Sequence, residues 1–180
     1  MSAQIRTART VRRAVVFVLA ALSLAACGPV ATSSSHGSGS GPSPSAPIAS
    51  RILPVSALLP QLAHGPTVVI FMATGCVSCA ADVGQLRQAL ASYPGVQAVG
   101  IDIVPQDTPT ILASFLDNQD LTDAPLLWTI DGSGSLVARY QMGMLDATVG
   151  IDRHGVISFR NTGPADAATL TAQLADLVKR

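Results

Sequence analysis

A Cys-x-x-Cys pair at the junction between an apolar run and a helical pattern constrains the fold of this chain more than any other feature. The run over 67–72, Thr-Val-Val-Ile-Phe-Met, is short and β-branched, as expected for a strand buried in a parallel sheet. Cys76 and Cys79 follow it. After them, apolar residues recur at helical spacing, at Val83, Leu86, Leu90 and Tyr93. This succession predicts a buried strand, a turn that carries the cysteines, and a helix.

The segment after this helix alternates between strand and helix patterns. A second strand is predicted over 96–103. A helix is expected to begin near Asp107 or Thr108, with Pro109 in its first turn. A further apolar strand surrounds Trp128, which we expect in the core.

Two short strands and a last helix complete the pattern. The strands 147–151 and 156–159 are separated by a turn that ends in Gly155, which predicts a hairpin. The last helix is expected from Pro164 onward. Strand–helix alternation followed by a hairpin and a helix predicts one α/β domain over 51–180, a three-layer fold in which helices flank a mixed central sheet.

The N-terminus has the pattern of a targeting signal. Four arginines within the first 13 residues precede an apolar run over 14–26. As a helix this run would be about 20 Å long, whereas the hydrocarbon core of a membrane is about 30 Å thick. A signal peptide over 1–26 therefore fits better than a permanent transmembrane helix.

The end of this run, Leu24-Ala25-Ala26-Cys27-Gly28, resembles the lipobox of bacterial lipoproteins. The resemblance implies that a diacylglyceryl group is attached to the Cys27 thiol and that cleavage makes Cys27 the new N-terminus. Two acyl chains hold a protein stably at a membrane. We therefore expect a lipid anchor in the cell membrane, with the protein facing the extracytoplasmic side. The alternative is ordinary secretion, with Cys27 merely near the cleavage site.

The segment behind Cys27 is poor in residues that a core could bury. Residues 28–50 are mostly Ser, Gly, Pro and Ala, which predicts that 27–50 is a lipidated cysteine followed by a flexible linker. Past Cys27 the chain has seven Lys and Arg residues against eleven Asp, a net charge of −4. An acidic domain lacks the basic surface that binds phosphates, so we expect no nucleic-acid partner.

If lipid consumes the Cys27 thiol, Cys76 and Cys79 are left to pair with each other. The N-terminus of a helix favours a thiolate, so Cys76 is the expected nucleophile, and Cys79 is placed to resolve the mixed disulfide. A static disulfide is the alternative, although so short a loop gives little stabilisation. A zinc site would need two further ligands that the sequence pattern does not supply.

The stretch from Val69 to Asp82 resembles the F-W-A-T-W-C-x-x-C-x-x-E signature of membrane-anchored thioredoxin-like proteins of the TlpA and ResA type. Segments 134–140 and 149–155 resemble a helix and a hairpin of the same family, so the resemblance covers about 52–180. It implies a thioredoxin-like fold and an envelope thiol–disulfide oxidoreductase that reduces or exchanges disulfides in exported proteins. No cofactor is expected, and the resemblance implies a membrane electron donor.

Matched residue by residue, the resemblance implies a catalytic role for both cysteines and for the acid that follows them, Asp82. An acid there could relay protons and would raise the pKa of a nearby thiol; the alternative is a solvated helix residue. The chain departs from the family at Gly75, where Trp is usual, and at Asp146, which takes the place of the cis-proline. We expect the Asp146 carboxylate either to face the cysteines and affect their chemistry, or to turn outward into solvent.

Other functions remain open. A Cu(I)-binding metallochaperone would use the soft thiolates together with Met142 and Met144, which precede Asp146. Copper-delivery proteins of the Sco type, however, have a wider cysteine spacing and a histidine, and position 147 is Ala. A peroxiredoxin would carry a proline that is missing before Thr74, and a redox-inactive binding scaffold would not use the cysteines at all.

Overall fold

The computed structural model describes residues 47–63 and 65–180. The signal peptide, Cys27 and most of the expected linker lie outside the described residues. A helical turn, α1 (Ile48–Arg51), is present where the linker was expected to end. Arg51 is buried and its guanidinium donates to the carbonyl oxygens of Thr122 and Ala124, which explains why the folded domain begins before residue 51.

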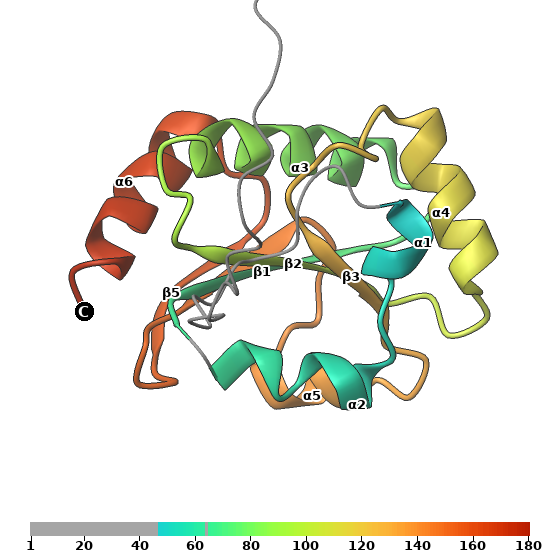
Figure 1. Cartoon of the computed structure of the whole chain (residues 1–180), viewed down its shortest axis with the longest axis horizontal. Helices are drawn as coiled ribbons and strands as arrows, with labels where there is room; N and C mark the ends of the chain where they lie inside the picture. Colours follow the sequence, from blue (N-terminus) through green and yellow to red (C-terminus); the bar gives the residue numbers. More distant parts are fainter. Residues whose placement is uncertain (1–46, 64) are drawn as a thin grey trace, which may run out of the picture. The chain divides into compact units, whose positions relative to one another are not determined.

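A five-stranded mixed sheet forms the middle layer, in the order β3-β2-β1-β4-β5 (Figure 1). Its strands are β1 (Thr67–Met72), β2 (Gln97–Asp102), β3 (Leu127–Ile130), β4 (Ala147–Ile151) and β5 (Ile157–Thr162). The first three strands are parallel to one another, whereas β4 is antiparallel to both β1 and β5. The predicted mixed sheet and the predicted hairpin are therefore confirmed.

Helices cover both faces of this sheet, which confirms the three-layer architecture (Figure 1). One face carries α3 (Val77–Leu90), α4 (Pro109–Asn118) and α6 (Ala167–Leu177). The other carries α2 (Val55–Leu58) and α5 (Ser135–Tyr140), with the short 3₁₀ turn η1 (Gln61–Ala63) after α2. Among the described residues, no helix combines the length and apolar character that crossing a membrane requires.

Side-chain caps set the starts of two helices. Thr108 accepts a hydrogen bond from the Ile111 N–H at 3.3 Å, so α4 begins as predicted, with Pro109 first. The last helix begins at Ala167 and not at Pro164 as predicted. The reason is Asp166, whose carboxylate accepts from the Thr169 N–H at 2.7 Å and caps the helix three residues after the expected start.

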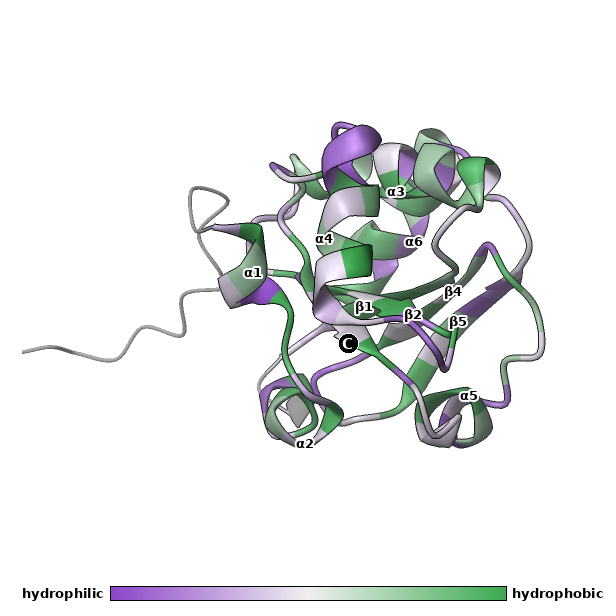
Figure 2. Ribbon diagram, turned by 90° about the vertical axis from the view of Figure 1, so that its right-hand side faces the viewer, coloured by the Kyte–Doolittle hydropathy of each residue, from purple (hydrophilic) through white to green (hydrophobic). Residues whose placement is uncertain are grey.

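Two hydrophobic clusters fill the spaces on either side of the sheet. All six residues of β1 are buried, with alternate side chains in alternate clusters, and Figure 2 shows apolar ribbon concentrated where the helices meet the sheet. Trp128 lies in the core as predicted. Its ring lies directly over Gly100 on the neighbouring strand, where a Cβ atom would overlap with it.

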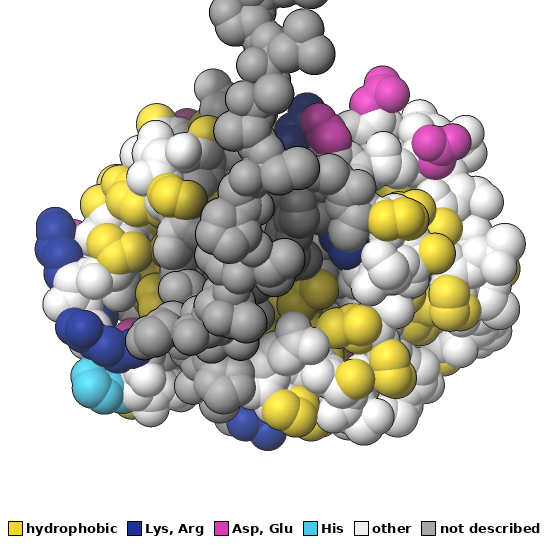
Figure 3. Space-filling view, in the orientation of Figure 1, with side chains coloured by type: hydrophobic (Ala, Val, Ile, Leu, Met, Phe, Trp, Pro, Cys, Tyr) yellow, Lys and Arg dark blue, Asp and Glu magenta, His cyan; other side chains and the backbone are white. Residues whose placement is uncertain are grey.

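Charged side chains are sparse on the face that Figure 3 shows. Basic side chains are visible at the left edge, at the top, near the middle and at the bottom of this face, with apolar and uncharged side chains between these places.

Candidate redox site

The two cysteines lie at the start of α3, immediately beyond the end of β1, and they form a disulfide. Cys76 is the N-cap of the helix, and its sulfur accepts a hydrogen bond from the Cys79 N–H at 3.2 Å. Cys76 is half-buried, whereas Cys79 is fully buried in the core. A sulfur at an N-cap is close to unpaired N–H groups and to the positive end of the helix dipole, both of which stabilise a thiolate.

Gly75 gives the chain the turn that places Cys76 at the N-cap. Its φ is +81°, in the left-handed region that L-residues with side chains rarely adopt. The glycine that replaces the family's Trp is thus suited to this backbone, and it leaves the approach to Cys76 without an aromatic cover.

Asp146 faces the disulfide, the first of the two orientations considered from the sequence. Its Oδ1 lies 3.8 Å from the Cys76 Sγ, and its Oδ2 accepts a hydrogen bond from the Ser78 hydroxyl at 3.2 Å. One carboxylate oxygen and both cysteine sulfurs lie within 4.8 Å of one another. The antiparallel start of β4 explains this position, because the Asp146 N–H donates to the Phe71 carbonyl at the end of β1.

Asp146 gives the two sulfurs an acidic neighbour of the kind that can bind a metal ion, beyond the two cysteines themselves. In the oxidised protein, however, the two sulfurs are bonded to each other, so the three groups are not a ligand set in this state. Met142, one of the two thioethers in the copper alternative, is only 4% exposed and packs in the cluster on the α5 side of the sheet. Met144 is 57% exposed.

Asp82 lies in the second turn of α3 and belongs to the same acidic neighbourhood. Its Oδ2 is buried without a hydrogen-bond partner. Burial and, to a smaller extent, the neighbouring Asp146 raise the pKa of Asp82 to about 6. Both sequence-predicted acids are thus close to each other and to the cysteines, and Asp82 is a group that gains and loses a proton near neutral pH.

Asp102 is a further acid with a raised pKa. The sequence predicted a strand at this position but no role for the side chain. It ends β2, pairs in register with Met72 of β1, and is fully buried. Burial, and to a smaller extent the nearby Asp107, raise the pKa of Asp102 to about 7, against the opposing effect of the Val104 N–H, which donates to it at 3.1 Å.

Asp107 connects this acid to the cysteine turn, since the Thr74 hydroxyl donates to its carboxylate. Thr74 lies two residues before Cys76, and Met72 packs in the same cluster as Cys79. The only sequence signal for Asp102 was an acid inside an otherwise apolar strand. Burial in the folded chain determines whether the pKa of such an acid is shifted.

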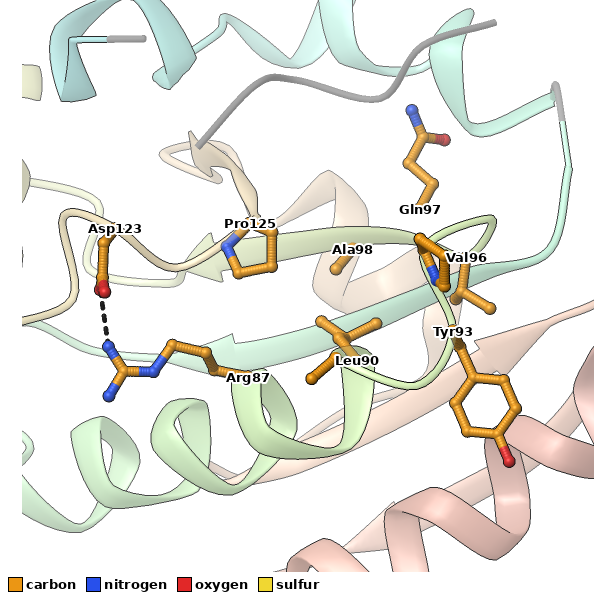
Figure 4. A pocket seen from close by; sticks show the side chains of 10 residues that line it. Arg87, Leu90, Tyr93, Val96, Gln97, Ala98, Asp123 and Pro125 are labelled. Carbon is orange, nitrogen blue, oxygen red and sulfur yellow. Dashed lines mark hydrogen bonds and ion pairs between the residues drawn. The ribbon is translucent and has the colours of Figure 1, made fainter. Parts of the chain in front are cut away.

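A pocket of about 490 Å³ lies at the opposite end of α3, where β2 begins (Figure 4). It is lined by Leu90, Tyr93 and Pro125 among others, and an ion pair of 2.6 Å between Arg87 and Asp123 closes one side. Neither cysteine lines this pocket. The cysteine site lies at the other end of the helix, where α3 begins.

Known proteins with similar sequences are few among the comparisons made with family models and curated proteins. No protein-family model matches the chain. A curated protein of Streptomyces lividans, mercury resistance operon ORF3, is 27% identical over 104 residues, which are 56% of this chain and 54% of that protein. The chain thus spans about half the length of this relative.

Solved structures of thiol–disulfide proteins are similar over most of the described domain. A secreted disulfide oxidoreductase of Mycobacterium tuberculosis, homologous to the Escherichia coli DsbE, is 25% identical with a TM-score of 0.52 and covers 63% of this chain and 82% of its own. StoA of Bacillus subtilis is 19% identical, with a TM-score of 0.53, covering 61% and 82%. A thiol–disulfide isomerase of Corynebacterium glutamicum is 22% identical, with a TM-score of 0.55, covering 64% and 82%.

The similarity to StoA and to the Corynebacterium glutamicum protein, each below 25% identity, establishes the fold. The disulfide at the start of α3 supplies a pair of cysteines that thiol–disulfide exchange can use. The chain thus has a thioredoxin-like fold with a Cys76–Cys79 disulfide at the start of α3, and it is similar to solved structures of disulfide oxidoreductases.

Proposed function

We propose that this protein is an extracytoplasmic thiol–disulfide oxidoreductase that reduces or exchanges disulfides in exported proteins. The observation that carries the proposal is the asymmetry of the cysteine pair: Cys76 is half-buried at an N-cap, and Cys79 is buried beneath it. One sulfur can be reached by a partner, and the other is reserved for the second step. The secreted Mycobacterium tuberculosis neighbour supports an extracytoplasmic location.

In the reducing direction, the Cys76 thiolate attacks one sulfur of a substrate disulfide. The substrate S–S bond breaks, a disulfide between Cys76 and the substrate forms, and the departing substrate thiolate takes up a proton. Cys79 then attacks the Cys76 sulfur, releases the second substrate thiol and closes the internal disulfide. Two electrons pass to the substrate, and the two thiol protons of the pair balance those that the substrate takes up. The reverse sequence oxidises a substrate dithiol.

The buried Cys79 needs a group that accepts its proton when it attacks and returns one when it leaves. Asp146 has a carboxylate oxygen within 4.8 Å of both sulfurs, and Asp82 lies beside it. The pKa of Asp82, about 6, is close to the range in which a carboxyl group exchanges protons efficiently at neutral pH. Asp146 therefore serves as the proton acceptor, with Asp82 as the second site of the relay. A carboxylate beside Cys76 also disfavours its thiolate, opposing the helix N-terminus.

Within this proposal, a lipid anchor on Cys27 holds the protein at the outer face of the cell membrane. Its support is the lipobox resemblance at Leu24 to Cys27, followed by a Ser-, Gly- and Pro-rich segment up to the domain. A flexible segment of about 20 residues has a root-mean-square reach of about 25 Å, which lets the redox site meet partners near the membrane surface. A membrane protein is then the natural electron donor for the Cys76–Cys79 disulfide.

A redox titration tests this function. The chain, with Cys27→Ser so that only one cysteine pair is present, is equilibrated in glutathione buffers of graded potential, and the reduced fraction is measured by alkylation and mass. A reversible two-electron transition supports an oxidoreductase; a midpoint near −270 mV suits a reductant and one near −120 mV an oxidant. A pair that stays oxidised below about −300 mV would be a static disulfide, and the proposal would be wrong.

A further inference from the structure

We propose that the partner of Cys76 presents a lysine or arginine beside its own reactive cysteine, and that Asp146 selects this cation. The inference rests on the proposed function, since it names the substrate class of the same disulfide. It commits to an extended segment of an exported protein in which a cationic side chain lies next to the cysteine.

The position of the carboxylate is the first observation. Asp146 Oδ1 is 3.8 Å from the sulfur that a partner must reach, and the Asp146 side chain is only partly buried. Two further contacts fix it: the hydrogen bond from Ser78 to Oδ2 and the hydrogen bond from the Asp146 N–H to the Phe71 carbonyl. A partner sulfur bonded to Cys76 brings the residues on either side of its cysteine within a few ångströms of this carboxylate.

The negative charge at the site has no cationic partner among the described residues. Their ion pairs are Arg87 with Asp123 and Lys179 with Asp176, and neither pair includes Asp146 or Asp82. Asp146 beside the reactive sulfur, and Asp82 next to Asp146, thus have no ion pair among the described residues. Charged groups at interfaces are arranged so that the potentials of the partners are complementary, so a partner with a cation is favoured and a partner with an acid is repelled.

Exposed apolar side chains lie next to Cys76 and Asp146 in the sequence, and they favour a protein segment over a small thiol as the partner. Val77 follows Cys76 and is 69% exposed, while Met144 and Leu145, which precede Asp146, are 57% and 37% exposed. All three are among the most exposed large apolar residues of the described chain. A second copy of this chain is a poorer occupant, because it would bring the same acids against these acids.

Two matched peptide disulfides test the inference with the full-length chain carrying Cys27→Ser. Each is a symmetric dimer of a short peptide with one cysteine, followed by Lys in one peptide and Glu in the other. The rate at which the reduced protein reduces each dimer is divided by the rate with dithiothreitol, an uncharged dithiol, which removes the intrinsic effect of the neighbouring charge on the disulfide.

We expect the normalised rate to be at least about tenfold higher for the Lys peptide at low salt, and the ratio to fall toward one at 1 M salt, where the screening length is about 3 Å. Asp146→Asn should bring the low-salt ratio close to one, whereas Asp117→Asn, which removes an exposed acid near the far end of α4, should leave it unchanged.

Equal normalised rates for the two peptides with the unsubstituted site, or an undiminished ratio in Asp146→Asn, would overturn the inference while leaving the proposed function standing. Preferential formation of a Cys76-linked homodimer by Cys79→Ser in the presence of the Lys peptide would overturn it in favour of a second copy. Failure to reduce either peptide, by contrast, would count against the proposed function itself.

Discussion

Asp146 and Cys76 are 70 positions apart in the sequence, yet the Asp146 Oδ1 and the Cys76 Sγ are 3.8 Å apart. The antiparallel pairing of β4 with β1 brings them together, since residue 147 pairs with Phe71 and the cysteine turn begins directly after β1. The sheet thus puts a carboxylate against the sulfur that the helix N-terminus favours as a thiolate.

Replacing Asp146 with Asn should lower the pKa of the Cys76 thiol, because a negative charge close to the sulfur opposes formation of the thiolate. The ultraviolet absorbance of the thiolate, followed against pH in the reduced chain with Cys27→Ser and Cys79→Ser, measures the pKa of Cys76. Asp117→Asn is the control of equal net charge. An unchanged Cys76 pKa in Asp146→Asn would mean that the carboxylate turns away once the disulfide opens.

Gly100→Ala should destabilise the fold by about 1–3 kcal/mol, because the added methyl group overlaps with the Trp128 ring in a packed core. Gly84→Ala is the matched control: it lies in α3 with nothing within 4 Å of the added Cβ, and should stabilise by up to about 1 kcal/mol. Urea unfolding of the two variants measures both. Equal effects would contradict the close approach of β2 and β3 at this point.

Asp102→Asn should change how stability depends on pH. Native Asp102 has a pKa of about 7, above its unfolded value near 3.9, so the native state holds a proton there that the unfolded state has lost. The contribution of Asp102 to stability is therefore fully present below about pH 4 and is lost as pH rises through 7. Asp82, whose pKa is about 6, is mostly ionised above pH 6. Of these two acids, only Asp102 therefore still contributes to the pH dependence of stability above pH 6.

The Asn variant should thus gain stability relative to the natural chain by on the order of 2 kcal/mol more at pH 8 than at pH 4. Urea midpoints at the two pH values provide the measurement, with Asp117→Asn as the comparison. A parallel pH profile for the natural chain and Asp102→Asn would rule out a buried, protonated Asp102.

Cys27→Ser should release the protein from membranes or block its processing, because the acyl chains on the Cys27 thiol are the proposed anchor. Membrane and soluble fractions of the producing bacterium, together with the mass of the mature N-terminus, give the answer. Unaltered membrane association and cleavage before residue 27 in the variant would contradict the lipid anchor.

The layers and the mixed sheet of the fold were largely predictable, because apolar periodicity marks the strands and helices, and breakers such as Pro94-Gly95 lie between them. The start of the last helix was missed because Pro164 and Asp166 both carry start signals, and the hydrogen bond to Thr169 decides for Asp166. The helical turn at 48–51 was hidden inside a linker-like composition and depends on long-range contacts of Arg51.

The site was predictable only in part. Cys76 and Cys79 are marked by local spacing, and Asp146 by the alignment to a family whose proline it replaces. Whether Asp146 faces the sulfurs depends on the pairing of β4 with β1, which no local pattern fixes. The pKa of Asp102 is raised chiefly because the folded chain buries its side chain, so a strand pattern alone could not assign it a role.

Trapping of the mixed disulfide tests the central claim, that Cys76 exchanges with partners and Cys79 resolves, most directly. The reduced chain, with Cys27→Ser and either Cys79→Ser or Cys76→Ser, is mixed with an exported protein that contains a disulfide, and covalent adducts are measured by intact mass. We expect a stable one-to-one adduct with Cys79→Ser and almost none with Cys76→Ser, because Cys79 is buried. Equal adduct yields from the two variants, or adducts through Cys79 alone, would contradict this account.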